Sequence, residues 1–324
     1  MDKGKKGTQK GLRVNDLIFK ELIKRGYSLE GNTRVWNIAD SKLWYLTPNQ
    51  AQSFLDLEDE PEYRKDVTEK ETNLIRGNIQ EIVESIGSNP INIIDLGCGD
   101  GRKAILFIEN LIGKAKMRYC PIDISNYMVE KAISRVSKIR GVDEVIKFQW
   151  NISDFENIEN ISALLRQGEY KKNVILLLGN TLGNFEINEL LYEIRSSMKE
   201  GDLLIIGNGL DNRKPEEILR SYDIKAFDKF SILPVTQLGF PEDSVQFGVR
   251  FKNSRIESYY TIKKPKQIAF LGKTVNFDVG DQIVVIISYK YNKEDFISFL
   301  KMYFDESKVY VSKDASYALV LCKK

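Results

Sequence analysis

Two kinds of apolar spacing alternate through the middle of the chain. Apolar residues three or four positions apart predict helices at 67–86, about 103–112, 126–138, 158–166 and 188–198. Short continuous apolar runs lie between these helices and predict strands at 91–95, 118–122, 145–150, 174–178 and 203–206. Apolar strands that alternate with amphipathic helices are typical of a parallel sheet buried on both faces. The middle of the chain is therefore expected to be α/β.

After Pro234 the spacing changes to that of antiparallel strands. Turn residues separate segments rich in β-branched and aromatic residues, at 245–251, 256–262 and 283–289. A helix is expected before them at 215–225, with Pro215 near its start, where the missing N–H costs nothing. A helix and two further strands close the chain, at 293–302, 308–311 and 317–322.

The stretch Asp95-Leu-Gly97-Cys-Gly99-Asp-Gly101 joins the first strand of the parallel set to its helix. Glycines at such a turn let the backbone approach a nucleotide without a Cβ clash. Arg102 occupies the position of the third glycine in the dinucleotide fingerprint, and the phosphate loop G-x-x-x-x-G-K-[ST] is absent. The form D-x-G-x-G-x-G is instead similar to motif I of S-adenosylmethionine (SAM)-dependent methyltransferases. We therefore expect SAM as the cofactor, with a glycine turn that binds nothing as the alternative.

This resemblance implies a Rossmann-like class I methyltransferase sheet, whose last two strands form an antiparallel pair. Residues 67–210 and 290–324 are then expected to form the SAM-binding domain. A second α+β domain, which holds the substrate, would be built from residues 14–66 and an insert at 211–289. Residues 1–13 are rich in lysine and glycine. They predict a disordered basic tail, with a nucleic-acid-binding arm as the alternative.

Composition restricts the chemistry further. The chain has 324 residues, and its 48 Lys and Arg against 46 Asp and Glu leave a net charge of +2. We therefore expect a monomer with no nucleic-acid or membrane partner. No apolar run approaches the ~20 residues of a membrane span, and three cysteines without metal-ligand spacing favour a cytoplasmic protein without disulfides. Histidine is absent, which excludes Ser-His-Asp catalysis and histidine metal sites, so no metal is expected.

Polar residues after the second and third parallel strands are candidates for the rest of the cofactor site. Asp123 ends the second strand, where a carboxylate can accept both ribose hydroxyls. It could instead cap the next helix together with Ser125. Asp154 can accept the adenine amino group while Phe155 covers the ring, although aspartate is also common in turns.

A second unusual segment, Leu178-Gly-Asn180-Thr-Leu-Gly-Asn184-Phe, ends the fourth parallel strand. It resembles the L-G-S-[ST]-[IL]-G-N-[FL] segment of the histidine-specific methyltransferase family. Those enzymes trimethylate the α-amine of L-histidine in ergothioneine biosynthesis, and relatives N-methylate a prenylated tryptophan. Three further pieces are similar to the family and extend the resemblance over Trp44–Lys324: Pro61-Glu62-Tyr63 with Phe54 nine residues before the tyrosine, Ser221-Tyr222-Asp223, and Ser288-Tyr-Lys290-Tyr291.

The resemblance implies a role for each matching residue. The cofactor site would comprise Asp95, Gly97, Gly99, Gly101, Lys103, Asp123, Asp154, Phe155 and Gly179. Tyr63, Asn184 and Tyr222 would hold the carboxylate and amine of the substrate, because phenols and amides supply the donors that fix a carboxylate. Tyr222 could instead be a buried helix residue, and Asn184 a helix cap. The remaining substrate pocket would be formed by Phe54, Asn180, Ile286 and Ser288.

One departure from the family pattern bears on the substrate. In the histidine-methylating enzymes an acid, two residues before the serine matched by Ser288, grips the imidazole, and here that position is Ile286. An apolar side chain cannot accept a hydrogen bond, so histidine is not the favoured substrate. Arg64 and Asn180 also replace a tyrosine and a serine of the family. The expectation is a SAM-dependent N-methyltransferase for the α-amine of a free amino acid or related small amine. Methylation of a macromolecule and a non-catalytic SAM-binding sensor are the alternatives.

Overall fold

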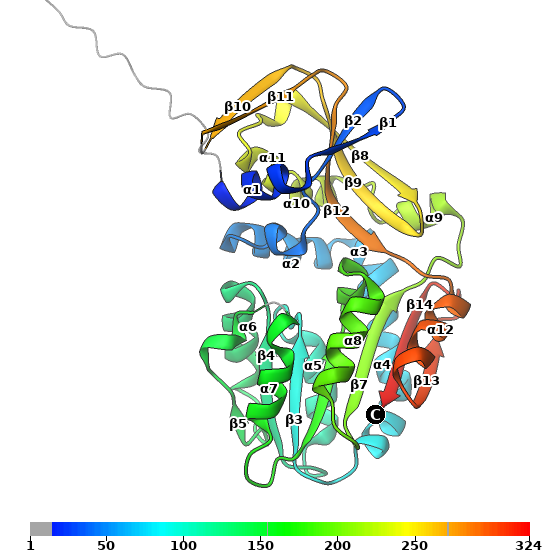
Figure 1. The fold of residues 1–324 in the computed structure, drawn as a ribbon. Coiled ribbons are helices and arrows are strands. Elements are labelled where there is room, and N and C mark those ends of the chain that lie inside the picture. The colour runs from blue at the N-terminus through cyan, green and yellow to red at the C-terminus, as the bar shows by residue number, and fades with distance from the viewer. Residues whose placement is uncertain (1–14, 154, 271) are drawn as a thin grey trace, which may run out of the picture.

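The computed structural model describes residues 15–153, 155–270 and 272–324, which fold around two sheets, one above the other in Figure 1. The larger, lower sheet has seven strands. Its order is β13 (Glu306–Val311), β14 (Tyr317–Lys323), β7 (Leu203–Gly209), β6 (Lys172–Leu177), β3 (Ile91–Leu96), β4 (Met117–Ile122) and β5 (Glu144–Val145). Only β14 runs antiparallel to its neighbours β7 and β13, and the other pairs are parallel.

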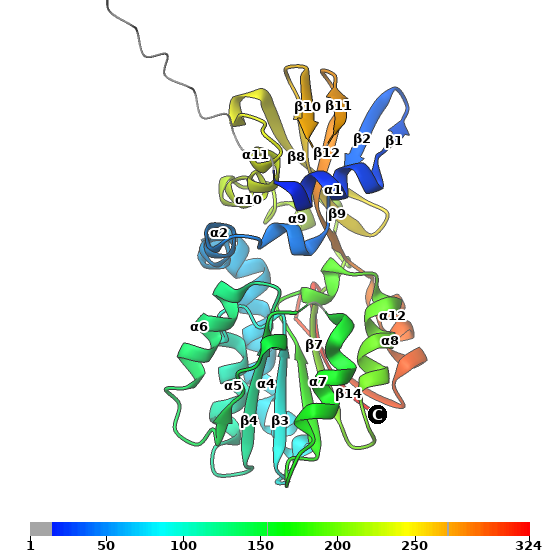
Figure 2. The same cartoon turned by 60° about the vertical axis from the view of Figure 1, so that its left-hand side comes forward.

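Helices cover both faces of the larger sheet because its strands are apolar on both sides. Ile91 and Ile93 of β3 pack against one layer, while Ile94 and Leu96 pack against the other. The first layer consists of α4 (Glu69–Ile86), α5 (Arg102–Leu111) and α6 (Asn126–Val136). The second consists of α7 (Ile158–Leu165), α8 (Ile187–Ser197) and α12 (Lys293–Tyr303), on the opposite side in Figure 2. The predicted α/β class is confirmed.

The upper sheet combines the start of the chain with residues 245–289. Its order is β1 (Tyr27–Glu30), β2 (Thr33–Asn37), β12 (Gln282–Tyr289), β9 (Arg255–Ile262) and β8 (Val245–Lys252). A separate hairpin stands beside it, β10 (Lys266–Phe270) and β11 (Lys273–Phe277). Four helices contribute to this part of the molecule: α1 (Asp16–Arg25), α9 (Pro215–Leu219), α10 (Lys225–Ser231) and α11 (Leu233–Gln237). Their apolar residues form a core with those of the sheet.

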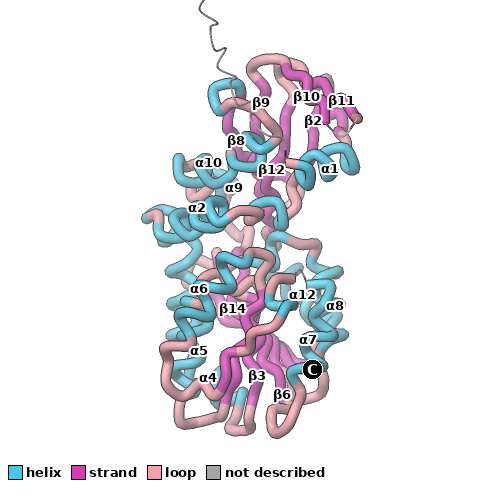
Figure 3. Tube along the Cα trace, turned by 90° about the vertical axis from the view of Figure 1, so that its left-hand side faces the viewer, coloured by secondary structure: helices cyan, strands magenta, loops and turns pink. Residues whose placement is uncertain are grey.

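The chain runs between the two parts at positions that shape the site. Helix α2 (Pro48–Asp59) lies between the sheets (Figure 3). Helix α3 (Pro61–Tyr63) follows it, and a π-helical turn at Arg64–Thr68 continues into α4. Strand β12 leads back from the upper sheet toward α12. The predicted domain boundaries at 14–66, 67–210, 211–289 and 290–324 remain predictions, and residues 1–13 lie outside the described residues. None of the helices in the described ranges is long and apolar enough to cross a bilayer.

Two predicted elements are shorter than their apolar patterns suggested. The strand expected at 145–150 pairs only at its start, in β5, and a 3-10 turn follows at Gln149–Asn151. The side chain of Asn151 makes the hydrogen bonds there in place of strand pairing. Its amide nitrogen donates to the Pro121 carbonyl, and its amide oxygen accepts from Phe148 N. The helix expected at 215–225 ends as α9 at Leu219, and a second helix, α10, begins at Lys225. The residues between the two helices bring Tyr222 to the cavity described below.

Candidate functional site

A cavity lies between the two parts of the molecule, at the carboxyl ends of β3, β4 and β6. Ligands of open parallel sheets bind at this edge. Residues of both parts line it, and they include fourteen of the sixteen predicted site residues: Phe54, Tyr63, Asp95, Gly97, Gly99, Lys103, Asp123, Phe155, Gly179, Asn180, Asn184, Tyr222, Ile286 and Ser288. Of the other two, Asp154 lies outside the described residues. The second, Gly101, does not line the cavity.

Gly101 has a packing role in the structure. Its φ of +78° lies in the left-handed region, and a Cβ there would sit 3.1 Å from the Cα of Ala132 in α6. Glycine therefore lets the start of α5 approach α6. Its predicted place in the cofactor site remains a prediction.

The glycine loop is held in place by Asp123. Gly99 N donates to one carboxylate oxygen at 3.1 Å, and Ser125 N donates to the other at 2.9 Å. Burial raises the pKa of Asp123 to about 6, although backbone N–H groups of Ser125, Gly99 and Ile124 oppose the shift. The carboxylate is thus charged at neutral pH, and each oxygen has lone pairs left for a ribose hydroxyl. Asp123 orders the turn before α6 and faces the cavity at the same time.

Lys103 is fixed by two buried acids. Its Nζ lies 2.9 Å from Glu58 of α2 and 3.3 Å from Glu71 of α4. Burial lowers the pKa of Lys103, but Glu58 and Glu71 outweigh that effect and the net pKa is raised. The other oxygen of Glu71 accepts from Gly179 N at 2.8 Å. This cluster ties α2, α4, α5 and the end of β6 together at the cofactor side of the cavity.

A polar network centred on Ser288 forms another wall. Its Oγ accepts from Asn180 Nδ2 at 3.1 Å and from Lys290 Nζ at 2.8 Å. Burial raises the pKa of Tyr222, and a hydrogen bond with Ser288 partly opposes that rise. Asn180 adopts a left-handed φ of +63° and accepts from Gly209 N at 2.8 Å, so one side chain connects the ends of β6, β7 and β12.

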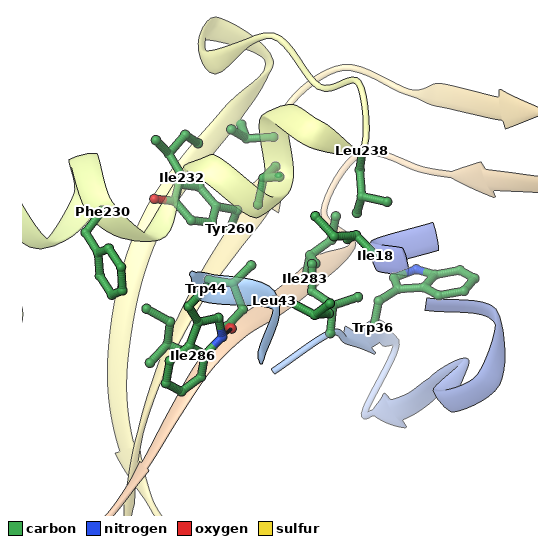
Figure 4. Close-up of a cluster of buried hydrophobic side chains, with 14 of the residues drawn as sticks. Ile18, Trp36, Leu43, Trp44, Phe230, Ile232, Leu238, Tyr260, Ile283 and Ile286 are labelled. Carbon is green, nitrogen blue, oxygen red and sulfur yellow. Dashed lines mark hydrogen bonds between the residues drawn. The ribbon is translucent and has the colours of Figure 1, made fainter. Parts of the chain in front are cut away.

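Apolar side chains form a further part of the lining. Trp44, Phe54, Phe230 and Ile286 line the cavity, and three of them are labelled in Figure 4. Trp44 Nε1 donates to the Val285 carbonyl at 2.7 Å, where the pairing of β12 with β9 is irregular between Val284 and Ile286. This bond fixes the indole beside Ile286. At the adenine end expected from the sequence, the rings of Phe155 and Phe185 lie 5.0 Å apart.

Several residues of the site escaped the sequence analysis. Glu71 stands four residues before Ile75, on the apolar face of α4. An acid at that spacing is expected to be buried and therefore to have a charged or hydrogen-bonding partner. Lys290 follows Ile286 and Ser288 at the two-residue spacing of an extended segment. The sequence therefore predicts that its side chain lies on the same face as theirs. Glu58 gave no signal, because it stands in a run of acidic residues, 56 and 58–60.

The comparison with protein families agrees with the geometry. A family model described as histidine-specific, SAM-dependent methyltransferase matches residues 49–324. The chain belongs to this family. The membership confirms the predicted resemblance, the class I methyltransferase fold and SAM as the cofactor of the family.

Individual relatives are distant. The N-methyltransferase fsqC of Aspergillus fumigatus is 27% identical over 248 residues, covering 72% of this chain and 66% of the relative. The N-methyltransferase imqF of Aspergillus flavus is 24% identical over 244 residues, covering 69% and 65%. The matched region thus spans slightly less than two thirds of each fungal relative. A solved SAM-dependent methyltransferase from Clostridium acetobutylicum is 16% identical, covers 84% of this chain and 98% of its own, and has a TM-score of 0.43.

The residues of the cavity fit the cofactor of the family. Asp123 offers acceptors for a ribose, and Phe155 with Phe185 offers an aromatic surface for a base. Lys103 supplies a cation for a carboxylate, while Glu58 and Glu71 leave the cluster with one net negative charge, which suits a cationic ligand.

Proposed function

We propose that the protein transfers a methyl group from SAM to the α-amine of a free amino acid, or a related small amine, whose side chain is apolar or aromatic. The observation that carries the proposal is the composition of the cavity beyond the cofactor residues. Tyr63, Asn184 and Tyr222 offer polar groups for an amine and a carboxylate. Trp44, Phe230 and Ile286 offer only apolar surface for a side chain, apart from the indole N–H, which Val285 already accepts.

Bound SAM supplies a methyl group on a sulfonium: the amine lone pair forms the new C–N bond, and the C–S electron pair stays on sulfur. The protein's contribution is alignment and the exclusion of water. Tyr63 and Tyr222 are buried, with ring centroids 6.0 Å apart, and their positions are fixed by packing. They are well suited to orient an acceptor rather than to exchange protons, because burial raises the pKa of both phenols above the usual range.

Ile286 supports an acceptor other than histidine. It is 4% exposed and packs in the cluster that contains Trp44 and Phe230. An imidazole placed there would lose its hydrogen bonds to water without a replacement, which costs about 1–3 kcal/mol for each unsatisfied group.

The test is SAM turnover with a panel of free L-amino acids, their decarboxylated amines and their amides. S-adenosylhomocysteine release and the mass of the product are measured. We expect methylation of apolar or aromatic amino acids that requires the free carboxylate, with histidine at least 10-fold poorer in kcat/KM. Silence across the panel, in a protein that still binds SAM, would refute the proposal.

The variant Ile286→Glu tests the side-chain part of the proposal. A carboxylate at this position should lower kcat/KM for the preferred amino acid by about 10-fold or more, because a charge replaces apolar surface. The kcat/KM for histidine should then rise, because the new carboxylate can accept a hydrogen bond from its ring N–H. The control is Ile286→Val, which keeps the surface apolar and should preserve the preference. If Ile286→Glu ranks the amino acids by kcat/KM as the wild type does, this position does not determine which side chain is preferred.

A further inference from the structure

An α-amino group is an ammonium ion near neutral pH and has no lone pair for a methyl group until it loses a proton. We propose that Lys290 accepts this proton through the hydroxyl of Ser288. The inference rests on the proposed function and adds to it the group that activates the amine. Lys290 lies next to the cavity rather than on its lining, so it would act through Ser288.

The geometry of β12 connects the two residues. Alternate residues of a strand share a face, which puts Ile286, Ser288 and the following Lys290 on one side. Ile286 and Ser288 line the cavity, and Lys290 Nζ lies 2.8 Å from Ser288 Oγ. Ser288 therefore stands between the amine of Lys290 and the space where an acceptor would bind.

Asn180 fixes the hydroxyl in this position. Its Nδ2 donates to Ser288 Oγ at 3.1 Å, while its Oδ1 is held by Gly209 N. One lone pair of the hydroxyl is thus used by a group that cannot accept a proton. The hydroxyl hydrogen and the second lone pair remain for Lys290 and for a ligand or Tyr222.

The surroundings of Lys290 favour its neutral form. The side chain is 4% exposed, and none of the ion pairs among the described residues includes it. The charged and titratable groups that face it are Arg213, itself paired with Asp66 at 3.6 Å, and Tyr222, whose ring centroid lies 5.8 Å from Nζ. Burial, and then the positive charge of Arg213, lowers the pKa of Lys290 to about 7.

The transfer balances in two linked steps. The Ser288 O–H bond breaks toward Lys290, whose nitrogen lone pair takes the proton, and the serine oxygen takes a proton from the ammonium N–H. The hydroxyl is restored, Lys290 becomes an ammonium, and the acceptor becomes a neutral amine with a free lone pair. After the product leaves, Lys290 returns the proton through Ser288 to water in the cavity.

A pH profile of turnover tests the relay, with the preferred amino acid of the panel as acceptor. In the wild type, kcat/KM should fall about tenfold per pH unit below pH ~7, as Lys290 becomes protonated. In Lys290→Met, kcat/KM at pH 7 should fall by about 100-fold, and its acidic limb should move up to the pKa of the acceptor's own ammonium. Lys290→Arg keeps the charge and the donor but cannot accept a proton, so it should match Lys290→Met.

The control is Lys172→Met, at the start of β6 and so at the edge of the larger sheet away from the cavity. Burial lowers the pKa of Lys172 as well, and its Nζ donates to the Ile86 carbonyl at 2.8 Å, away from the cavity. This variant should keep the wild-type profile. Restoration of wild-type turnover at pH 7 by Lys290→Arg, or an unchanged acidic limb in Lys290→Met, would overturn the relay.

A second measurement needs no acceptor. In protein labelled with [ε-¹³C]lysine, the resonance that disappears in Lys290→Met should titrate near pH 7, while exposed lysines titrate near pH ~10. A resonance that titrates above pH ~10 would overturn the relay whatever the panel shows. Titration near pH 7 together with a silent panel would refute the proposed function and, with it, the use of Lys290 in amine activation.

Discussion

Gly179 lies close to Lys103 at the cofactor end of the cavity. Its φ is +72°, and a Cβ at this position would lie 2.6 Å from Lys103 Nζ. A lysine end can usually move away, but this one is held by Glu58 and Glu71. Alanine at 179 should therefore displace Lys103 and weaken SAM binding by about 10-fold or more, an expectation that corresponds to ~1.4 kcal/mol. Calorimetric titration of SAM measures the effect.

Gly201 provides the matched control for Gly179. It has a similar φ of +85°, and a Cβ there would meet nothing within 4 Å. Gly201→Ala should carry the same conformational cost of about 1 kcal/mol in the free energy of unfolding without a change in SAM affinity. Equal losses of SAM affinity in both variants would show that the backbone conformation, rather than the contact with Lys103, determines binding.

Motif residues could be predicted one by one because glycines and polar residues directly after the buried strands of a parallel sheet lie where ligands bind. Gly97, Asp123 and Asn180 illustrate this, since each follows an apolar strand of the parallel set. Charged residues on helices could not be assigned in the same way. Glu58 and its acidic neighbours are chemically alike in sequence, and only the fold shows that Glu58 is the one whose carboxylate meets Lys103, at 2.9 Å.

Strand β12 supplies Ile286 and Ser288 to the cavity lining, and its irregular pairing with β9 near Val285 lies directly before them. Trp44 stabilises the irregularity by donating to the Val285 carbonyl. Trp44→Phe should leave this buried carbonyl without its partner and lower the free energy of unfolding by about 1–3 kcal/mol. Because Ile286 and Ser288 follow directly, the KM for the acceptor should rise several-fold, while SAM affinity stays the same.

Trp36→Phe is the control for this effect. Trp36 belongs to the same apolar cluster, but it is not part of the cavity lining, and its Nε1 lies 3.5 Å from Asp281 Oδ2. This variant should change stability without changing the KM for the acceptor. If both substitutions raise that KM equally, general loosening of the upper sheet explains the loss, and the bond from Trp44 to Val285 does not.

Elements with strong apolar spacing were predicted well, and short polar ones were missed. Strands β3, β4, β6 and β7 lie close to their predicted positions because both of their faces are buried. The hairpin of β1 and β2 was missed, because β1 is largely exposed and carries little apolar pattern. The Gly31-Asn32 pair between them is a typical hairpin turn and could have revealed it.

The site as a whole places ionisable groups of opposite type in one buried region between the two parts of the molecule. Burial raises the pKa of Asp123 to about 6 and lowers that of Lys290 to about 7, so each group resists its charged form. The contribution of Asp123 to the free energy of unfolding is fully present below its unfolded pKa of ~3.9 and is lost as pH rises through its folded pKa of about 6. For Lys290, stability rises with pH between about 7 and the unfolded pKa of ~10.4.

The cofactor-free protein should therefore respond in opposite directions to removal of the two groups. Relative to the wild type, Asp123→Asn should gain about 1–2 kcal/mol of unfolding free energy as pH rises from 5 to 8, because only the wild type is destabilised by a carboxylate that becomes charged while buried. Lys290→Met should be more stable than the wild type at pH 7, and this difference in unfolding free energy should shrink by about 2 kcal/mol between pH 7 and 9. The folded wild type must keep the amine neutral, and that cost falls as pH approaches the unfolded pKa. Urea unfolding at these pH values measures both differences. Differences that do not change with pH would mean that neither group is shifted by burial, whereas parallel slopes would point to a change in the fold as a whole rather than to two opposed charges at one site.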